Sequence, residues 1–492
     1  MDIVLIKPNN QKKVFQALSE DFSGIEPPLW LILMAAYLRE SGATVSVIDA
    51  EAENLSVEET IERAVTLKPV LVSVVVSGTN PSASTINMPG AGLFLQEIKK
   101  VAQDIPTVLC GLHPSALPEQ TMKEEAADFV VEGEGFTTHL ELVAALKSKK
   151  DIGDEFCIKG LWYRKDRRIF SNPRAENIDD LGILPMPAWD LLPMDKYRAH
   201  NWHCFSHIKE RQPYAVIYTS LGCPFHCDFC CINSIFGKPG IRYRPPQQVV
   251  EEVEYLVKHY GMRNIKILDE LFVSKWSHVE AICDGIIAKG LGEKLNFWAY
   301  GRIDSVKEHM LKKMKQAGIN WLAYGIEAGS KKVRDGVTKG RFTQDDIKRV
   351  IAMTHDAGIE VVSNFIFGLP DDDMETMQET LDLAKELNCA YANLYCAMAY
   401  PGSKLYADAV QQGTPLPKSW SAYSQFSKDC LPLATKYLSG PQVLKFRDEA
   451  FDNYFTDPRY LARIEERFGL EAVNNIKKMC MVKLVRNNYP KD

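Results

Sequence analysis

The sequence predicts an α/β protein in which two domains built on parallel sheets are followed by a helical region. Residues 2–147 alternate short β-branched runs with helical patterns, and the same alternation resumes at residue 213 and continues to about residue 400. Residues 411–492 show helical periodicity alone. Strands that alternate with helices over short connections are typical of parallel sheets, because each parallel neighbour needs a crossover. The 492 residues suffice for two or three domains.

The first domain, residues 1–148, is expected to be a doubly wound parallel sheet. Its strands are expected at residues 2–7, 44–49, 69–76, 106–110 and 128–131. Its helices are expected at residues 29–41 and 137–147, and from about residues 56, 91 and 115. In such a sheet, ligands bind beyond the carboxyl ends of the strands. Small and polar residues occupy those ends at 77–85, 111–115 and 133–135, where they form either a ligand site or ordinary turns.

Residues 149–212 are expected to be a linker and not a further domain. The segment contains several prolines and a basic run at 164–168, which is typical of a solvated turn. Two short runs with strand character, 158–164 and 168–170, flank that turn and predict a small hairpin within the linker.

The second domain, residues 213–410, is expected to hold six strands, nearly all of which lead into a helix. The strands are expected at 214–220, 264–269, 296–300, 322–327, 360–367 and 391–398, and the helices at 246–260, 277–289, 307–316, 343–357 and 374–387. Residues 411–492 add candidate helices at 441–454, 459–468 and 471–485, which form a substrate lid or a packing subdomain.

Three cysteines follow the first strand of the second domain on one short loop. Cys223, Cys227 and Cys230 have the spacing C-x3-C-x2-C, which can place three thiolates on one face of a cuboidal iron–sulfur cluster. The fourth iron then has no protein ligand and is free to bind a cofactor or substrate. Buried thiols or a zinc site are the alternatives. Cys231 is left out of the ligand set, because adjacent residues do not easily reach the same cluster face.

This cysteine loop resembles the signature of the radical S-adenosylmethionine (SAM) superfamily. The resemblance implies a [4Fe-4S] cluster whose open iron chelates SAM, and a reduced cluster that cleaves SAM to a 5′-deoxyadenosyl radical. It also implies an external one-electron reductant of flavodoxin or ferredoxin type, and packing of Phe229 against adenine. The six strands then form the open (β/α)6 partial barrel of that superfamily, similar to a TIM barrel, with its site at the strand ends.

Other strand ends of the second domain resemble the SAM-binding segments of the same superfamily. Asp269 and Glu270 are candidates for the SAM amino group, although an acid near a helix start is the alternative. Arg302 suits the SAM carboxylate, or instead pairs with a neighbouring acid. Glu327 would accept hydrogen bonds from the ribose or the amino group, and Ser330 would assist. Residues 367–371 resemble the loop that supports adenine, and residues 400–406 resemble a stretch common after the core in B12-bearing members, although each alone is an ordinary turn.

The first domain, placed ahead of this core, resembles the Rossmann-like cobalamin-binding (B12-binding) domain of B12-dependent radical SAM enzymes. It departs from the better-known corrinoid pattern Asp-x-His-x-x-Gly, which is absent from the first 150 residues. The resemblance therefore implies cobalamin without a histidine lower ligand, and makes His113 a loop residue near the corrin. The candidate cobalamin-binding residues are Ser77, Asn80, Ser82, Ser84, Thr85, Gly111, His113, Gly133 and Glu134.

Composition narrows the partners and the compartment. The formal net charge of −6 provides no global basic field, which argues against a nucleic-acid substrate. The chain opens without a basic, cleavable leader, so its 12 cysteines are expected in a reducing, cytoplasmic setting. The longest apolar run, residues 27–38, is too short to span a bilayer, and no membrane association is expected.

Together the two resemblances predict a methyltransferase that acts on an unactivated carbon, or on phosphorus, of a small-molecule substrate. Methylcobalamin would supply the methyl group, and a 5′-deoxyadenosyl radical would abstract a substrate hydrogen. A B12-dependent cyclase or ring-rearranging enzyme is the nearest alternative. Methylthiolation is less favoured, because the first 150 residues contain only Cys110 where that class has three cluster cysteines. An iron–sulfur electron carrier is disfavoured by the three-cysteine count, and no catalytic side chain is identified.

Overall fold

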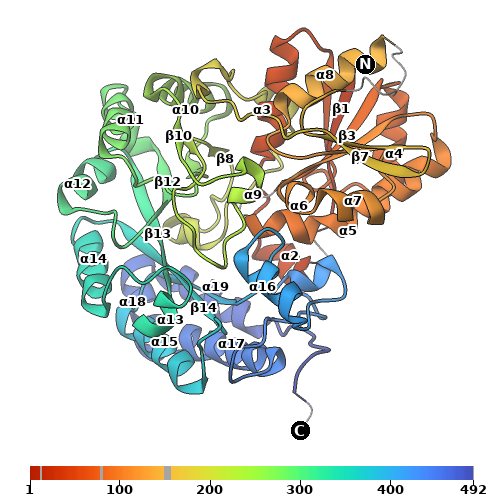
Figure 1. Ribbon diagram of the computed structural model, residues 1–492. Helices are drawn as coiled ribbons and strands as arrows, with labels where there is room; N and C mark the ends of the chain where they lie inside the picture. Colours follow the sequence, from red (N-terminus) through yellow and green to blue (C-terminus); the bar gives the residue numbers. More distant parts are fainter. Residues whose placement is uncertain (11–13, 78–80, 149–156, 491–492) are drawn as a thin grey trace.

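The computed structural model contains two large sheets of mainly parallel strands, which lie side by side with helices around both (Figure 1). It describes residues 1–10, 14–77, 81–148 and 157–490. Within these ranges, no helix is both long and apolar enough to cross a membrane. The predicted fold class is confirmed: a Rossmann-like sheet comes first, a six-stranded parallel sheet second, and helices complete the chain.

The first sheet has the strand order β2-β1-β3-β4-β5-β6-β7. Its parallel strands are β1 (Ile3–Lys7), β2 (Val45–Asp49), β3 (Leu71–Val76), β4 (Thr107–Gly111) and β5 (Phe129–Val131). Side chains alternate between two cores, so that Leu5 and Val75 face one side of the sheet and Val4 and Val74 the other. Both faces are buried, which explains the continuous apolar runs of these strands.

The helices of the first domain begin earlier than predicted at two of the strand ends. They are α2 (Leu18–Asp21), α3 (Leu29–Glu40), α4 (Val57–Thr66), α5 (Pro81–Val101), α6 (Leu112–Ala116), α7 (Pro118–Glu124) and α8 (Phe136–Lys147). Helix α5 begins ten residues before the predicted start, because Pro81 opens it and Pro89 is accommodated inside it. Helix α6 likewise replaces most of the expected loop at 111–115.

The hairpin expected in the linker is present, but it belongs to the first sheet. Strands β6 (Leu161–Lys165) and β7 (Arg168–Ser171) pair with each other, and β6 pairs antiparallel with β5. The carbonyl of Gly160 also accepts from the amide of Glu132 at 2.8 Å. The hairpin therefore extends the parallel sheet instead of standing apart in a linker.

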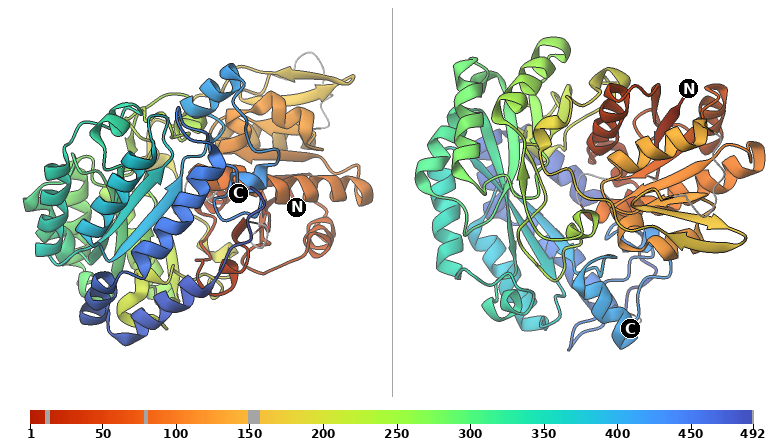
Figure 2. Two further views of the ribbon diagram at one scale, coloured as in Figure 1. Left: turned by 90° about the horizontal axis from the view of Figure 1, so that it is seen from below. Right: turned by 45° about the horizontal axis from the view of Figure 1, so that its top comes forward.

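The second sheet runs in chain order, β8-β11-β12-β13-β14-β15, with every neighbouring pair parallel. Its strands are β8 (Tyr214–Ile217), β11 (Asn264–Ile267), β12 (Asn296–Gly301), β13 (Ile319–Glu327), β14 (Glu360–Phe367) and β15 (Tyr391–Cys396). The helices that follow them are α9 (Asn233–Phe236), α10 (Pro246–Tyr260), α11 (Trp276–Ala288), α12 (Glu308–Gln316), α13 (Lys331–Asp335), α14 (Gln344–Asp356), α15 (Met374–Leu387) and α16 (Lys404–Gln412). The curved sheet with its outer layer of helices is the predicted partial barrel (Figure 2).

The last three helices pack against the barrel and close its amino-terminal end. They are α17 (Gly440–Phe455), α18 (Pro458–Phe468) and α19 (Leu470–Met481). Phe468 stacks on Trp321 of β13 at 5.8 Å between ring centroids, and Trp202 from the short 3-10 helix Trp202–His207 meets the same ring at 5.6 Å. These contacts assign α17–α19 to packing, so the lid interpretation applies only to residues before them.

A buried ion pair joins the two domains. Glu26, from the loop between α2 and α3, lies 3.3 Å from the ammonium of Lys266 on β11 and accepts from the Tyr214 hydroxyl at 2.9 Å. Burial opposes ionisation of Glu26, but Lys266 and His200 outweigh it and hold the pKa of this carboxyl at about 2. The first domain therefore inserts a charged side chain between barrel strands.

Candidate active site

One cavity of about 440 Å³ lies between the carboxyl ends of the two sheets. Three parts of the chain line it: strand-end residues of the first domain, the cysteine loop and strand ends of the barrel, and residues 424–426. Parallel strands present their following loops at one edge, so two facing sheets enclose a common space. Most of the lining side chains are apolar or aromatic, with a few charged groups on the barrel side.

The three predicted cluster ligands share one wall of this cavity. Cys223, Cys227 and Cys230 all line it, on the loop that follows β9 (Ser220–Leu221). A backbone hydrogen bond from Cys230 to the Cys227 carbonyl, 2.9 Å long, tightens the loop. The set fits a cuboidal cluster, because each thiolate of such a cluster binds a different iron and the three sulfurs need not converge on one ion. Cys231 is 2% exposed and also borders the cavity.

Arg302 lies against the cysteine loop. Its Nη1 is 3.9 Å from the sulfur of Cys227, and its guanidinium carbon is 3.8 Å from the centroid of the Phe225 ring. Nε and Nη2 form a bidentate pair with Asp304 at 2.8 and 2.9 Å. The pairing of Arg302 with a neighbouring acid is therefore observed, and because Arg302 also lines the cavity, its contact with the SAM carboxylate stays a prediction.

Glu327 is paired with a lysine that the sequence analysis did not identify. Lys339 donates to the Glu327 carboxylate at 2.8 Å, and both residues are 6% exposed and line the cavity. Burial opposes the charge, but Glu327 and Cys227 outweigh it and keep the pKa of Lys339 above its usual value. Lys339 also lies 5.9 Å from the centroid of the Phe229 ring.

A bulge in β13 turns the Glu327 carboxylate toward this lysine. The register of β13 against β14 shifts between Gly325 and Glu327, and Glu327 has a φ of 68°. A side chain at Gly325 would place its Cβ 2.5 Å from the Glu327 oxygen and 2.9 Å from the Lys339 nitrogen. Only glycine therefore leaves room for the pair.

The two adjacent acids after β11 take different positions. Glu270 lines the cavity, accepts from the Gly222 amide at 3.0 Å, and has its pKa raised by burial to about 7. Asp269 does not line the cavity. Its oxygens accept from the amide and hydroxyl of Thr219 and from the hydroxyl of Ser220, at 2.5–2.6 Å. Asp269 thus fixes the strand that leads into the cysteine loop, and we withdraw it as a SAM ligand.

Of the other two candidates for SAM contacts, Phe229 lines the cavity and Ser330 does not. Phe229 lines the cavity next to its cysteine neighbours, as an adenine-packing ring requires. Ser330 is 8% exposed and stands at the start of α13, outside the cavity lining. Its proposed assistance to Glu327 has no support from this geometry.

In the first domain, two of the predicted residues line the cavity directly. Ser77 follows β3 and Ser84 lies on α5, and both are part of the cavity wall. Asn80 falls outside the described residues, and so does the side chain of Ser82. Thr85 and Gly111 are buried and do not belong to the cavity lining.

His113 is not placed to bind a metal from the cavity. It is 1% exposed, its Nδ1 lies 3.2 Å from the Thr85 hydroxyl, and the ring of Trp420 packs on it at 4.5 Å between centroids. Burial lowers the pKa of His113 to about 3, so its imidazole is neutral. His113 therefore lies on the short helix α6 and not on the predicted loop, with its ring against Thr85 and Trp420.

The third predicted loop of the first domain, residues 133–135, is not part of the cavity lining. Gly133 donates its amide to the Ser115 hydroxyl at 3.0 Å. The carboxylate of Glu134 accepts from Arg242 at 2.5 Å and from the Ile178 amide at 2.8 Å. Glu134 therefore ties the first domain to the segment after the cysteine loop, and the cobalamin contacts of Gly133 and Glu134 stay predictions.

The backbone at Gly111, at the end of β4, requires glycine, and a substitution can test this requirement. Its φ is +132° and an added Cβ would lie 2.4 Å from the Val76 carbonyl oxygen. We expect Gly111→Ala to lower the free energy of unfolding by at least about 3 kcal/mol, because strain and a backbone clash add. Gly42→Ala, with a φ of +88° and open space around the Cβ, should cost only about 1 kcal/mol. Equal losses by chemical denaturation would contradict this assignment.

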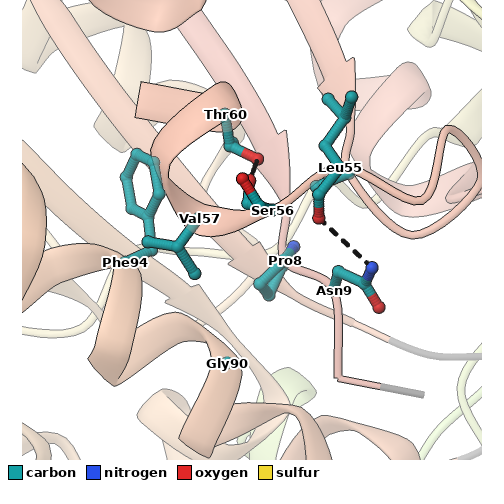
Figure 3. A pocket seen from close by; sticks show the side chains of 9 residues that line it. Pro8, Asn9, Leu55, Ser56, Val57, Thr60, Gly90 and Phe94 are labelled. Carbon is teal, nitrogen blue, oxygen red and sulfur yellow. Dashed lines mark hydrogen bonds between the residues drawn. The ribbon is translucent and has the colours of Figure 1, made fainter. Parts of the chain in front are cut away.

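A second, smaller hollow of about 200 Å³ lies where β1 and β2 end, beside α4 and α5 (Figure 3). Asn9 donates to the Leu55 carbonyl at 3.3 Å across its floor, and the Thr60 hydroxyl donates to the Ser56 carbonyl at 2.7 Å. None of the predicted site residues lines this hollow.

Two family models match the chain in the order the sequence predicts. A B12 binding domain matches residues 16–143, and the Radical SAM superfamily matches residues 217–384. These ranges cover the strand ends on either side of the cavity, including all three cysteines.

Several known proteins resemble the chain over most of its length. An uncharacterized methyltransferase of Pyrococcus horikoshii is 29% identical over 484 residues, 98% of each chain. The anaerobic magnesium-protoporphyrin IX monomethyl ester cyclase of Rubrivivax gelatinosus is 30% identical over 83% of this chain and 70% of its own length. Among solved structures, the radical S-adenosylmethionine methyltransferase TsrM from Kitasatospora setae superposes with a TM-score of 0.69, at 18% identity, over 94% of this chain and 90% of its own.

Proposed function

Because this chain belongs to the radical SAM enzymes that carry a B12-binding domain, we propose that it is a cobalamin-dependent methyltransferase of an unactivated carbon in a small molecule. The observation that carries the proposal is the shared cavity. Strand ends of the B12-binding domain and the cysteine loop of the barrel line the same space. A methyl donor held by one domain and a radical generator held by the other would thus reach one substrate.

On the barrel side, the cavity residues fit a cluster and a SAM molecule. Cys223, Cys227 and Cys230 would hold the [4Fe-4S] cluster. Arg302 and Lys339 are the cations available for the SAM carboxylate, and Glu270 and Glu327 are the acids available for its amino and ribose groups. When bound, the cluster supplies the reductive cleavage of SAM and cobalamin supplies the methyl transfer.

On the opposite side, the first domain presents small or apolar side chains against which a corrin would lie. Ser77, Ser84 and Leu112 line the cavity with small or apolar surfaces, whereas His113 is held behind them by Thr85 and Trp420. The corrin would therefore be held by loop contacts and excluded from water, with no histidine below the cobalt.

The remaining wall suits a small substrate with apolar surface. Tyr300, Tyr395, Met398 and Phe426 belong to it, and they present aromatic and apolar surface to the space between the two domains. A nucleic acid would need a basic groove, which the net charge of −6 does not favour. The reductant would be an external one-electron donor.

Cyclisation without methyl transfer is the second candidate, because one relative is a cyclase and matches 83% of this chain. Anaerobic reconstitution with iron, sulfide and hydroxocobalamin, followed by turnover with SAM and substrate extracts, separates the two. A methyltransferase yields S-adenosylhomocysteine together with 5′-deoxyadenosine and a product heavier by one methylene. A product without added carbon, or a protein that retains no corrinoid, would rule out the methyltransferase proposal.

A further inference from the structure

Arg302 is held in one orientation beside the cysteine loop. Its Nε and Nη2 donate to the two carboxylate oxygens of Asp304 at 2.8 and 2.9 Å, and its backbone amide donates to the Ser305 hydroxyl at 3.2 Å. The ring of Phe225 covers one face of the guanidinium, 3.8 Å from the guanidinium carbon. Arg302 is also buried, so contacts on an edge, a face and the backbone fix this cation together.

The nitrogen that Asp304 does not use lies next to a predicted cluster ligand. Nη1 is 3.9 Å from the sulfur of Cys227, within reach of a hydrogen bond to sulfur. A thiolate bound to iron carries negative charge, so a guanidinium that donates to it makes a charge-assisted hydrogen bond. Of the three predicted ligands, Cys227 is thus the one beside a cationic side-chain donor.

The other two sulfurs have backbone donors. Burial raises the pKa of the Cys223 thiol, whereas a hydrogen bond from the Phe225 amide lowers it. Burial likewise raises the pKa of the Cys230 thiol, and a hydrogen bond from the Ile232 amide lowers it. A backbone amide carries no net charge, so the donor at Cys227 differs in kind from the donors at Cys223 and Cys230.

The charge of Asp304 offsets that of Arg302 only in part at this sulfur. The carboxylate binds the Nε–Nη2 edge, which lies opposite Nη1, so it is farther from Cys227 than the guanidinium is. The side chain of Asp304 is 24% exposed against 7% for Arg302, so water screens the carboxylate more strongly. The field of the pair at Cys227 is therefore positive.

We propose that Arg302 is a positioning residue that raises the reduction potential of the cluster through Cys227. Hydrogen bonds to the sulfurs are among the factors that set the potential of an iron–sulfur cluster, and a nearby positive charge stabilises the reduced state, which holds one more electron. The inference rests on the proposed function, because it takes Cys227 as a cluster ligand. It concerns the cluster before SAM binds, and is thus separate from a contact between Arg302 and the SAM carboxylate.

The midpoint potential of the cluster would be measured by redox titration, followed through the electron paramagnetic resonance signal of the reduced cluster. The full chain would be reconstituted with iron, sulfide and hydroxocobalamin, and SAM would be left out. We expect Arg302→Met to make reduction about tenfold less favourable, which is about 59 mV toward lower potential for one electron. Arg302→Lys keeps the charge and should recover part of this shift. Asp304→Asn keeps Arg302 and removes the opposing charge, so its potential should lie above that of the wild type.

Arg459→Met is the matched control for these variants. Arg459 also forms a bidentate pair with an aspartate two residues away, since its Nε and Nη2 lie 3.3 and 3.1 Å from the oxygens of Asp457. The pair belongs to α18, at the amino-terminal end of the barrel, and the side chain of Arg459 is 69% exposed. The potential of this variant should equal that of the wild type.

An unchanged potential in Arg302→Met, with iron and sulfide at the wild-type content, would overturn the inference. If Arg302→Met holds no cluster, the other two variants decide, and a wild-type potential in Asp304→Asn would overturn the inference as well. So would an equal shift in Arg459→Met. The titration needs no turnover, so absence of a methylated product counts against the proposed function alone, whereas a wild-type chain that assembles no cluster would refute both.

Discussion

Replacing Cys230 with alanine should lower the yield of 5′-deoxyadenosine from SAM at least about 100-fold. Loss of a residue that merely orients a metal ligand already costs 10- to 100-fold, and loss of the ligand itself should cost more. Cys230 lines the cavity with Cys223 and Cys227, and a cluster with two remaining thiolates has a second iron without a protein ligand. Chromatography of the nucleoside products after anaerobic reduction would measure the effect, and iron and sulfide analysis would show its cause.

Cys231→Ala is the matched control for this experiment. Cys231 is the next residue in the chain and is 2% exposed, so its replacement removes a buried thiol of the same size. We expect this variant to retain its iron and sulfide. Equal loss of iron from both variants would show that the loop is sensitive to any substitution, and full activity of Cys230→Ala would refute the ligand assignment.

Lys339→Met should have the second largest effect, on both stability and SAM binding. The substitution leaves Glu327 buried without its partner at 2.8 Å, which is expected to destabilise the fold by about 3–5 kcal/mol. It also removes a cation proposed for the SAM carboxylate, which should raise the dissociation constant of SAM about 10- to 100-fold. Thermal unfolding and equilibrium dialysis with labelled SAM would measure the two effects separately.

A second variant separates those two contributions. In Lys339→Met/Glu327→Gln the unpaired carboxylate is gone, so much of the stability should return while SAM binding stays weak. Lys331→Met, on the exposed side of neighbouring α13, should change stability by less than about 1 kcal/mol, because its pair with Asp335 is solvated. Normal SAM affinity in Lys339→Met would contradict the assignment.

Sequence patterns predicted the regular elements well where local preferences and packing agree. Helices α10 and α15 begin and end at the predicted residues, and the six barrel strands lie at or within the predicted positions apart from β12, which is one residue longer, and β13, which begins three residues earlier. Helix α5 was mispredicted because a proline inside a helix and a proline that ends one look alike in sequence. Whether Pro89 is tolerated depends on the packing around it.

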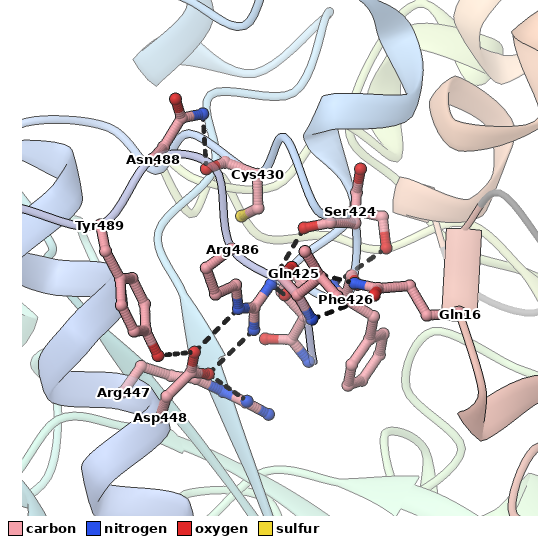
Figure 4. A network of polar contacts seen from close by, with 12 residues as sticks. Gln16, Ser424, Gln425, Phe426, Cys430, Arg447, Asp448, Arg486, Asn488 and Tyr489 are labelled. Carbon is pink, nitrogen blue, oxygen red and sulfur yellow. Dashed lines mark hydrogen bonds and ion pairs between the residues drawn. The ribbon is translucent and has the colours of Figure 1, made fainter. Parts of the chain in front are cut away.

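Site residues were predictable when they follow a strand directly and not otherwise. The cysteines, Arg302 and Glu327 follow or end strands, and all of them reach the cavity. Lys339 lies 12 residues after Glu327 and reaches it through a bulge, which no spacing rule indicates. Gln425, which also lines the cavity, accepts a hydrogen bond at its carbonyl from Arg486, 61 residues away in the chain (Figure 4). Contacts of this kind arise only when the whole chain is folded.

The ion pair between Glu26 and Lys266 also affects cofactor exchange. A corrinoid is a large ligand. If it lies between the two domains, its exchange requires the two sheets to move apart. Parting them breaks this pair and also exposes the apolar surface that the two domains bury together, such as Trp30 against Tyr218 and Phe236, so closed molecules should predominate. Cobalamin acquired during folding should therefore stay with one protein molecule over many turnovers, while the smaller SAM exchanges at each one.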